Sequence, residues 1–286
     1  MSIVVPQIAA GTTKVRAKQY IAELYPNVAL VARKKSGKTV VLYNLLKAMC
    51  SRYTRVIIIC PTVTKDKTYG AILAMLRKRG CEVLCYTEIG DNITRHIAPP
   101  AEPERSEDED GADERSKQIE QSELGQLMFG GMQHSATDGP DGDANDSDDA
   151  KDEEAMEAER DRRAAKRGTP TDLYVLDDLG EEMRHASVYQ LLKMNRHHHA
   201  AVLMSIQYPN NLTPSSWKQL DAALLFAHHN DKKLREMYTA LDPPVDFERF
   251  RAMYLEATKP EYSFLTIEHG SDRPFRIQFR KKLSSA

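Results

Sequence analysis

The stretch VARKKSGKTV, residues 31–40, decides the fold that this sequence predicts. It ends like the phosphate-binding loop G-x-x-x-x-G-K-[ST], with Gly37, Lys38 and Thr39 in the last three places. In such a loop the backbone N–H groups and the lysine contact the phosphates, and the hydroxyl binds Mg²⁺. Ala32 stands where the first glycine belongs. Because a residue that directly follows a strand needs no positive φ, we expect Ala32 to weaken the motif without destroying it.

The segments on either side of this loop fit the same interpretation. The apolar run VALVA (28–32) predicts a strand, and TVVLYNLLKAMCSRY (39–53) has apolar residues at helical spacing. A phosphate loop needs this order of strand, loop and helix. The candidate nucleotide-binding residues are therefore Ala32, Arg33, Lys34, Lys35, Ser36, Gly37, Lys38, Thr39 and Val40.

A second motif, DLYVLDDLGEE at 172–182, is an apolar strand that ends in acids. A carboxylate at such a strand end completes the Mg²⁺ site of a phosphate loop, so Thr39 and Asp177 are the candidate metal ligands. We expect this strand to lie adjacent to the loop strand in the sheet. Asp178, in the place where ATPases of this branch mostly carry glutamate, is the candidate base for the attacking water, and Glu181 is the alternative.

A third motif is the S-x-Q that ends the predicted strand AAVLMSIQ (200–207). It places Gln207 beside the γ-phosphate, where an amide can exchange hydrogen-bond partners during hydrolysis. The helix before this strand ends in Arg196-His197.

The rest of the chain alternates between strands and helices, which predicts an α/β fold. Further strands are expected at 55–62, 81–87 and 171–179, and a short helix with a strand within 216–229. Helices are expected at 68–80, 187–198, 231–243 and 246–260, and a closing hairpin at 262–270 and 273–283. Apolar strands alternating with helices indicate a mostly parallel sheet covered on both faces, with function at the carboxyl ends of the strands.

The near-neutral formal charge of −2 hides an uneven distribution. Residues 101–170 hold 22 of the 42 acidic residues but only 9 of the 40 basic ones, which leaves 20 acidic and 31 basic residues elsewhere. A basic body fits a polyanionic partner such as nucleic acid. The acidic segment is poor in aromatic and branched apolar residues, so we expect a mostly disordered insert over 99–170, helical at 151–167. The apolar stretch at 124–132 is either an incidental feature of this loop or a docking point.

Three parts follow from this pattern: residues 1–98 and 171–286 as two halves of one ATPase domain, and 99–170 as the insert between them. No apolar run is long enough to span a membrane, and the first residues lack the pattern of a secretory signal.

Five features of the sequence, taken in order, resemble the poxvirus-type genome packaging ATPases. They are GKT, an apolar strand that ends in DD, Arg196-His197 before an apolar strand, S-x-Q, and Pro214 four residues before Lys218. These belong to the FtsK–HerA superfamily of P-loop NTPases and serve large and mid-sized DNA viruses with double-jelly-roll capsids. The resemblance covers about residues 25–95 and 170–230. It implies a RecA/FtsK–HerA-like fold, ATP and Mg²⁺ as cofactors, and an ATPase that packages double-stranded DNA.

The resemblance also implies partners and a location. They are a homo-oligomeric ring around DNA bound without sequence preference, viral capsid proteins, and the host cytoplasm or nucleus or the virion. In such a ring a basic residue reaches the neighbouring subunit's nucleotide. Lys218 stands where the family has an arginine and lacks its planar fork, so Arg196, which the resemblance makes a candidate catalytic residue, and Arg184 are the alternatives. Lys65, Lys67 and the run 77–79 are candidates for the DNA channel. The acidic insert is a candidate DNA mimic, in which case deleting 99–168 would raise DNA-stimulated hydrolysis.

Other functions share parts of this pattern. A small-molecule kinase also has the loop and the sheet, but the paired acids and S-x-Q favour water as the nucleophile. A GTPase would carry N-K-x-D, which the sequence lacks. A non-catalytic scaffold is compatible with Ala32, and a cellular DNA-pumping or helicase-like ATPase of the same superfamily shares every motif.

Overall fold

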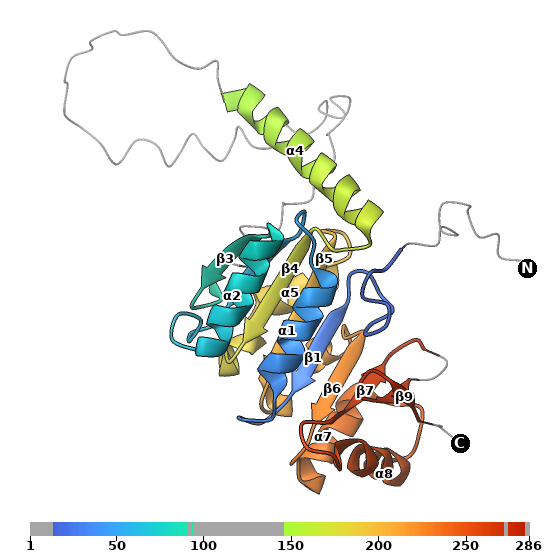
Figure 1. The fold of residues 1–286 in the computed structure, drawn as a ribbon. Coiled ribbons are helices and arrows are strands. Elements are labelled where there is room, and N and C mark those ends of the chain that lie inside the picture. The colour runs from blue at the N-terminus through green and yellow to red at the C-terminus, as the bar shows by residue number, and fades with distance from the viewer. Residues whose placement is uncertain (1–13, 91–92, 94–145, 272–273, 284–286) are drawn as a thin grey trace, which may run out of the picture. The chain divides into compact units, whose positions relative to one another are not determined.

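The computed structural model of the protein describes residues 14–90, 93, 146–271 and 274–283 (Figure 1). Most of the expected insert, including the apolar stretch at 124–132, lies outside the described residues. The strands are β1 (Asn27–Val31), β2 (Arg55–Ile59), β3 (Glu82–Tyr86), β4 (Asp172–Asp177), β5 (Ala200–Ile206), β6 (Ala222–Phe226), β7 (Phe264–Glu268), β8 (Phe275–Ile277) and β9 (Lys281–Lys282). The helices are α1 (Lys38–Met49), α2 (Lys67–Arg79), α4 (Asp146–Arg167), η4 (Gly180–Arg184), α5 (Ala186–Met194), η5 (Pro209–Asn211), α6 (Pro214–Trp217), α7 (Asp231–Leu241) and α8 (Phe247–Thr258).

The strands form one sheet in the order β3-β2-β4-β5-β1-β6-β7-β8-β9. The strands from β3 to β6 run parallel to their neighbours, and β7, β8 and β9 continue the sheet in antiparallel pairs. The sheet is mostly parallel, so the predicted α/β fold class and the C-terminal hairpin are confirmed. The carboxyl ends of the six parallel strands share one edge of the sheet, which we call the carboxyl edge; the other is the amino edge.

The expected adjacency of the loop strand and the acidic strand is wrong. β5 lies between β1 and β4, and its residues pair in register with both, so that Ser205 is opposite Leu30 on one side and Asp177 on the other. Sequence order does not fix sheet order, because each crossover helix can return the chain to either side. The consequence is that the end of β5 lies between the phosphate loop and the acids.

Both faces of the sheet are covered, as the alternation predicted. Alternate residues of each buried strand point to opposite faces. Val28 and Leu30 of β1 pack in the cluster with α1 and α2, whereas Ala29 and Val31 pack in the cluster with α5, α7 and α8. Figure 1 shows α1 and α2 in front of the sheet, with α5 behind it.

The chain divides into two units, residues 99–153 and the remainder. The described end of α4 belongs to the larger unit: Ala164 and Thr169 are buried, and Thr169 Oγ1 lies 2.9 Å from Ser51 Oγ. Gly168 has φ +67°, and a Cβ there would lie 2.5 Å from the carbonyl oxygen of Lys14. This close approach explains why only glycine fits after α4.

An ion pair fixes the register at the amino edge of the sheet. The Arg55 guanidinium donates from Nε and Nη2 to the two carboxylate oxygens of Asp172, both at 2.8 Å, and the two residues are register partners on β2 and β4. Bidentate pairs of this kind are geometrically specific. Among the described helices, none combines the length and the apolar character needed to cross a membrane.

Candidate active site

The phosphate loop, residues 32–39, leaves β1 at the carboxyl edge and opens α1. Ala32 is fully buried, and its N–H donates to the Ile206 carbonyl at 2.9 Å, which extends the pairing of β1 with β5. Its φ is not positive, whereas Lys35 (φ 64°) and Gly37 (φ 86°) are left-handed. The turn that a loop glycine would ease is therefore made further along the chain, as expected from the position of Ala32.

The loop has the features of an anion site. Gly37 is the N-cap of α1 and no side-chain hydrogen bond caps the helix. The amides of Val40 and Val41 donate to the Gly37 carbonyl, which leaves those of Lys38 and Thr39 facing the loop. The hydroxyl oxygen of Ser36 is buried with no hydrogen-bond partner. Buried polar atoms are normally paired, and a bound phosphate would supply the missing partner. These observations fit a nucleotide at this loop.

Lys38 lies at the centre of the site. Its Nζ donates to Asp177 Oδ1 at 2.7 Å and to Ser205 Oγ at 2.8 Å, so the ends of β4 and β5 converge on the loop lysine. Tyr69 of α2 donates its hydroxyl to the other Asp177 oxygen at 2.8 Å. Burial raises the pKa of Tyr69, which keeps the hydroxyl protonated as a donor. Both oxygens of the buried Asp177 are thus held in place.

Two of these contacts were not predicted. Ser205 is part of the S-x-Q motif, but only Gln207 was given a role from the sequence. Tyr69 shares the buried face of α2 with Ile72 and Leu76, and this spacing is typical of a core residue. No pattern in the sequence indicates that its hydroxyl reaches the end of β4.

The candidate base and the candidate sensor are in contact. Gln207 Nε2 donates to Asp178 Oδ1 at 2.8 Å. Asp178 has φ 58°, a left-handed conformation that Asp tolerates better than most residues, and its side chain is exposed. The turn directs Asp178 away from the buried position of Asp177, so two adjacent acids have different surroundings.

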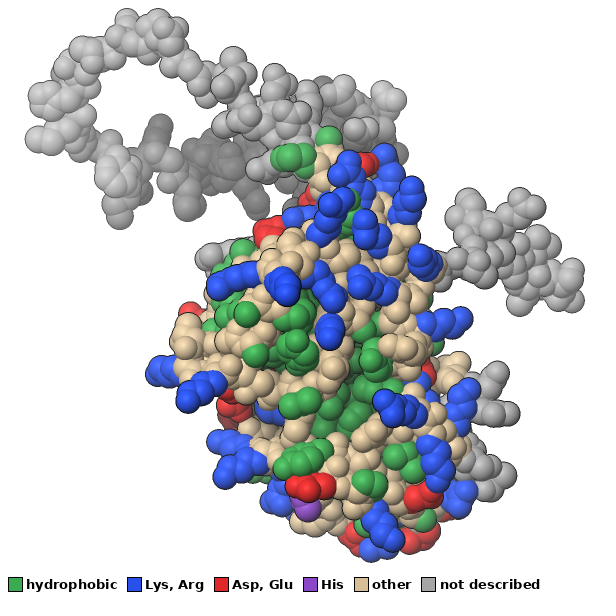
Figure 2. Space-filling model, viewed as in Figure 1, with side chains coloured by type: hydrophobic (Ala, Val, Ile, Leu, Met, Phe, Trp, Pro, Cys, Tyr) green, Lys and Arg blue, Asp and Glu red, His purple; other side chains and the backbone are tan. Residues whose placement is uncertain are grey.

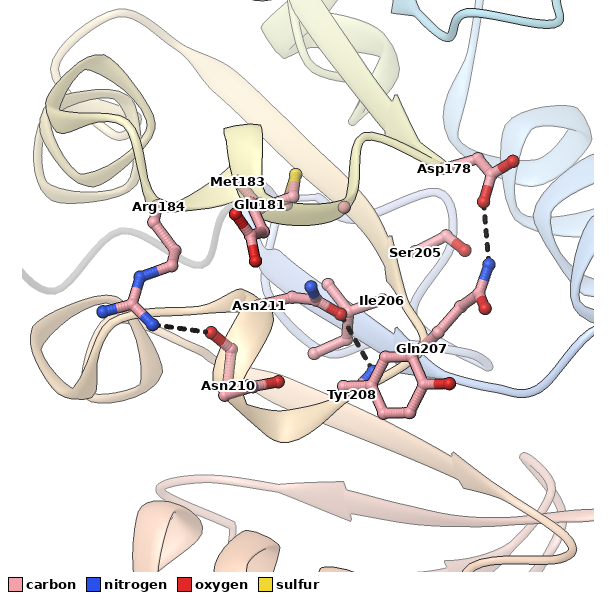
Figure 3. A pocket seen from close by; sticks show the side chains of 11 residues that line it. Asp178, Glu181, Met183, Arg184, Ser205, Ile206, Gln207, Tyr208, Asn210 and Asn211 are labelled. Atoms are coloured by element: carbon pink, nitrogen blue, oxygen red, sulfur yellow. Dashed lines mark hydrogen bonds between the residues drawn. The ribbon is translucent and has the colours of Figure 1, made fainter.

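A pocket of about 570 Å³ opens beside this pair. Figure 3 shows Asp178 and Gln207 facing each other on one side, with Glu181 and Arg184 coming from η4 on the other. Arg184 Nη1 donates to the Asn210 carbonyl at 3.2 Å. The structure therefore brings the alternative base Glu181 into the same pocket as Asp178, although on the opposite wall.

The residues present also fit a magnesium ion at the loop. Mg²⁺ prefers oxygen ligands and is usually bound by one or two carboxylates together with substrate phosphates and water. Thr39 offers a hydroxyl, and the Asp177 carboxylate lies at the end of β4 with Lys38. The described residues contain no cluster of three or more acidic, histidine or cysteine side chains that could hold a metal alone. A site completed by nucleotide phosphates does not require one.

The other loop residues differ in exposure. Arg33, Lys34, Lys35 and Val40 are exposed, and Arg33 Nη1 donates to the His228 carbonyl at 3.2 Å. Next to His228, the buried His229 has its Nε2 3.2 Å from the carbonyl oxygen of Val31, the last residue before the loop. Burial lowers the pKa of His229, which favours the neutral ring. His229 was not predicted from the sequence.

Arg196 and Lys218 lie at the opposite edge of the sheet from their own chain's phosphate loop. Arg196 precedes β5, and its Nη2 donates to Asp221 Oδ1 at 2.5 Å. Both residues line a pocket of about 270 Å³ that also includes Lys193. Neither residue contacts Lys38, so a catalytic role for Arg196 within its own chain is not compatible with this arrangement.

The candidate channel residues do not form one surface. Lys65 and Lys67 lie at the start of α2, and the run 77–79 lies at its end, which is about 20 Å away for a helix of this length. Arg79 is half-buried and donates to the Cys50 carbonyl at 3.0 Å. We therefore consider the two ends of α2 separately.

A basic cluster that was not predicted lies near the second end of α2. The guanidinium carbons of Arg52, Arg163 and Arg167 are 4.8, 5.8 and 5.3 Å from the ring centroid of Tyr53. Figure 2 shows Lys and Arg side chains gathered over the end of α4 and the neighbouring ends of α1 and α2. A group of guanidinium side chains of this kind suits the phosphate backbone of a nucleic acid.

Comparisons with known proteins found similar structures but no sequence relatives. No protein-family model matches the chain, and no curated protein matches it. The genome packaging NTPase B204 of Sulfolobus turreted icosahedral virus 2, in complex with AMP, is 16% identical over 86% of this chain and 93% of that chain, with a TM-score of 0.46. The DNA-packaging ATPase B204 of Sulfolobus turreted icosahedral virus is 16% identical over 85% and 92%, with a TM-score of 0.43.

ATPases 2 and 3 of EssC from Geobacillus thermodenitrificans are 11% identical over 85% of this chain and 38% of that chain, with a TM-score of 0.37. The two B204 structures are of viral genome packaging enzymes, the class that the sequence motifs resemble, and the poxvirus-type branch is not represented among these three. Such low identities and TM-scores do not carry a function from one chain to another. The function is therefore inferred from this chain's own residues.

Proposed function

We propose that this protein is an ATP-hydrolysing motor that moves double-stranded DNA and packages a viral genome into a preformed capsid. The observation that carries the ATPase part is the convergence of the loop lysine, Asp177 and Ser205, with the Asp178–Gln207 pair beside them. A basic turn with no role in nucleotide binding would not be expected to contact the ends of two strands that carry acidic and amide side chains.

The residues of this site have different roles in the proposed hydrolysis. Lys38 has three donors, of which two are used by Asp177 and Ser205, so one remains for a phosphate oxygen. Mg²⁺, held by Thr39 and Asp177, would supply charge neutralisation on the phosphates. Asp178 accepts a proton from water as the water oxygen bonds to the γ-phosphorus and the bond to the β-phosphate breaks. Gln207, already bonded to Asp178, orients that water.

The test of the ATPase is hydrolysis by the purified chain, measured with and without duplex DNA. Lys38→Ala should abolish hydrolysis, and the exposed Lys259→Ala serves as the matched control. If Asp178 is the base, Asp178→Asn should lower the rate by about 10²- to 10⁴-fold, and Glu181→Gln should have a small effect. Equal hydrolysis by Lys38→Ala and the control would refute the proposed site.

We propose that the basic group that completes the site comes from a neighbouring subunit. Arg196 and Lys218 lie together at the edge opposite their own phosphate loop, as a residue acting in trans would, whereas Arg184 lines the pocket of its own chain. A subunit-mixing assay separates them. If Arg196 acts in trans, Arg196→Ala mixed with Lys38→Ala should recover activity that neither has alone. Arg184→Ala mixed with Lys38→Ala should not recover it.

The DNA partner is proposed from charge. The basic cluster around Tyr53 offers three guanidinium groups, and phosphate contacts of this kind make binding salt-dependent and independent of sequence. Neutralising Arg52, Arg163 and Arg167 with glutamine should lower DNA affinity and reduce its salt dependence. Duplexes of different sequence should be affected equally. An unchanged salt slope would exclude this cluster as the DNA surface.

The deletion that tests the acidic insert should remove residues 99–153 and not 99–168. Removal of 99–168 would take away the described end of α4, including the buried Ala164 and the partners of Arg55 and Glu82. Deletion of 99–153 leaves these contacts in place. If the insert mimics DNA, this shorter deletion should raise DNA-stimulated hydrolysis; unchanged stimulation would reject the mimic.

Stimulation by DNA distinguishes a motor from a scaffold but does not identify the cargo. Packaging into a capsid and DNA pumping in a cell use the same hydrolysis. DNA uptake into empty capsids from the same source, dependent on ATP and lost in Lys38→Ala, would support packaging. Stimulation by DNA without any capsid-dependent uptake would favour the cellular DNA pump.

A further inference from the structure

A pocket of about 410 Å³ lies on the side of the phosphate loop away from Asp178 and Gln207. Three parts of the chain form it: the turn before β1, the exposed face of α1, and residues 262–264 together with 278–280. Figure 2 shows hydrophobic side chains reaching the surface between α1 and the antiparallel part of the sheet. The residues that line it are Gln19, Tyr20, Val41, Asn44, Tyr262, Phe264, Gln278, Phe279 and Arg280.

Aromatic rings dominate the walls of this pocket. Phe279 makes edge-to-face contacts with Tyr20 and Phe264, at centroid separations of 5.0 and 5.2 Å. These contacts hold the Phe279 ring in place. Tyr262 is 60% exposed, so its ring is accessible to a ligand in this pocket.

Tyr262 connects the pocket to the phosphate loop. A Cβ built on Gly37 would lie 3.2 Å from Tyr262 Cδ1, so the ring packs against the turn that precedes Lys38. Tyr262 itself has φ 57°, and a tyrosine in the left-handed region is uncommon. The structure thus holds an exposed aromatic ring against the loop at some cost in backbone strain.

The direction of a bound nucleotide selects this pocket over the neighbouring ones. Asp178 and Gln207 mark the γ-phosphate end, so the sugar must leave the loop on the opposite side, past Gly37. A pocket of about 510 Å³ on the other side of the loop shares Gln207 and is lined by Arg33, Lys34 and Lys233. Its tyrosine, Tyr208, already has the Lys233 ammonium 4.0 Å from its ring centroid. That surface suits anions better than a base.

The polar groups of the aromatic pocket suit a heterocycle. Gln19, Asn44 and Gln278 carry amides that can both donate and accept hydrogen bonds. The volume is within the usual range for small-molecule sites, about 300–1,000 Å³. A pocket with flat aromatic walls and a few amides matches a base and its ribose.

We propose that this pocket binds the nucleoside part of the nucleotide, with the base against Tyr262 and Phe279. The inference rests on the proposed nucleotide site and extends it. It assigns a role to the segment after 260, which the ordered motifs do not reach. The C-terminal strands are then part of the nucleotide site and not only an extension of the sheet.

Binding of two ligands to the full chain tests this assignment. ATP carries the base and the triphosphate, whereas inorganic tripolyphosphate carries the triphosphate alone. Calorimetry with Mg²⁺ should show that Tyr262→Ala weakens ATP binding at least fivefold, as expected for a lost stacking contact. Tripolyphosphate affinity should change by less than about twofold, because the loop lysine is intact. Tyr262→Phe keeps the ring and should keep ATP affinity.

A control variant shows whether the effect is specific to Tyr262, and the contrary results separate the nucleoside pocket from the phosphate loop. Leu255→Ala removes another exposed apolar side chain, 50% exposed, on the far helix α8, and should affect neither ligand. An unchanged ATP affinity in Tyr262→Ala, or equal affinities of the wild type for ATP and tripolyphosphate, would overturn the nucleoside pocket while leaving the phosphate loop standing. If neither ligand binds the wild type, the loop itself is not a nucleotide site and both proposals are wrong.

Discussion

Substituting Ala32 by glycine restores the missing residue of the phosphate-loop motif. The structure predicts that this change lowers the free energy of unfolding and does not improve nucleotide binding. Ala32 is fully buried and its φ is not positive. Losing the buried methyl group costs about 0.8 kcal/mol. The extra freedom of glycine in the unfolded chain costs about 0.4–1 kcal/mol more. The free energy of unfolding should therefore fall by about 1–2 kcal/mol.

For a domain of this size, about 2–4 °C of Tm corresponds to each kcal/mol, so the Tm of Ala32→Gly should fall by about 2–8 °C. Thermal unfolding of the nucleotide-free chain measures this change, and calorimetry measures the Kd for ATP. We expect the Kd to stay within about twofold of the wild type, since the left-handed turns lie at Lys35 and Gly37. A tenfold gain in affinity, which is about 1.4 kcal/mol, would show that Ala32 does impair the loop.

Three further predictions follow from contacts described above. Tyr69→Phe removes the second donor to Asp177, so urea unfolding should show a loss of about 1–3 kcal/mol, and hydrolysis should need more Mg²⁺; unchanged values for both would mean that the contact has no role. The pKa of His229 is lowered in the folded chain, so its stabilising contribution is present above the unfolded pKa near 6.5 and is lost as pH falls through the folded pKa. The Tm of the wild type should therefore drop more steeply than that of His229→Gln on acidification below about pH 6.5, and parallel profiles would contradict this. Gly168→Ala should lower the Tm because its Cβ would meet the Lys14 carbonyl, whereas Gly70→Ala in α2, with nothing within 4 Å, should raise it; the reverse order would refute the packing described.

The sequence predicted the local elements and both partners of the Lys38–Asp177 contact. Lys38 and Asp177 were found because a phosphate loop and an acidic strand end each have a pattern that can be recognised in a few residues. The strands were found because both faces of the sheet are buried, which makes each strand a continuous apolar run.

Other parts of the site depend on contacts between distant segments. The position of β5 between β1 and β4 is a property of sheet order, and no local pattern encodes it. Tyr69 and His229 are separated from their partners by more than one element of the fold, and each is compatible with an ordinary core residue. The aromatic pocket combines residues from both ends of the chain, so periodicity could not bring Tyr20 and Tyr262 together.

The two outer strands of the sheet limit how copies of this protein can associate. An unpaired strand edge can accept another strand and extend a sheet from one chain into the next. β9 is only two residues long, and both residues are exposed lysines, of which Lys281 pairs with Glu256. At the other border, Glu82 of β3 is paired with Arg160 of α4. A border as short and charged as β9 disfavours strand addition, so copies of this chain that associate on that side of the sheet would be joined through helices and loops and not through a continuous sheet.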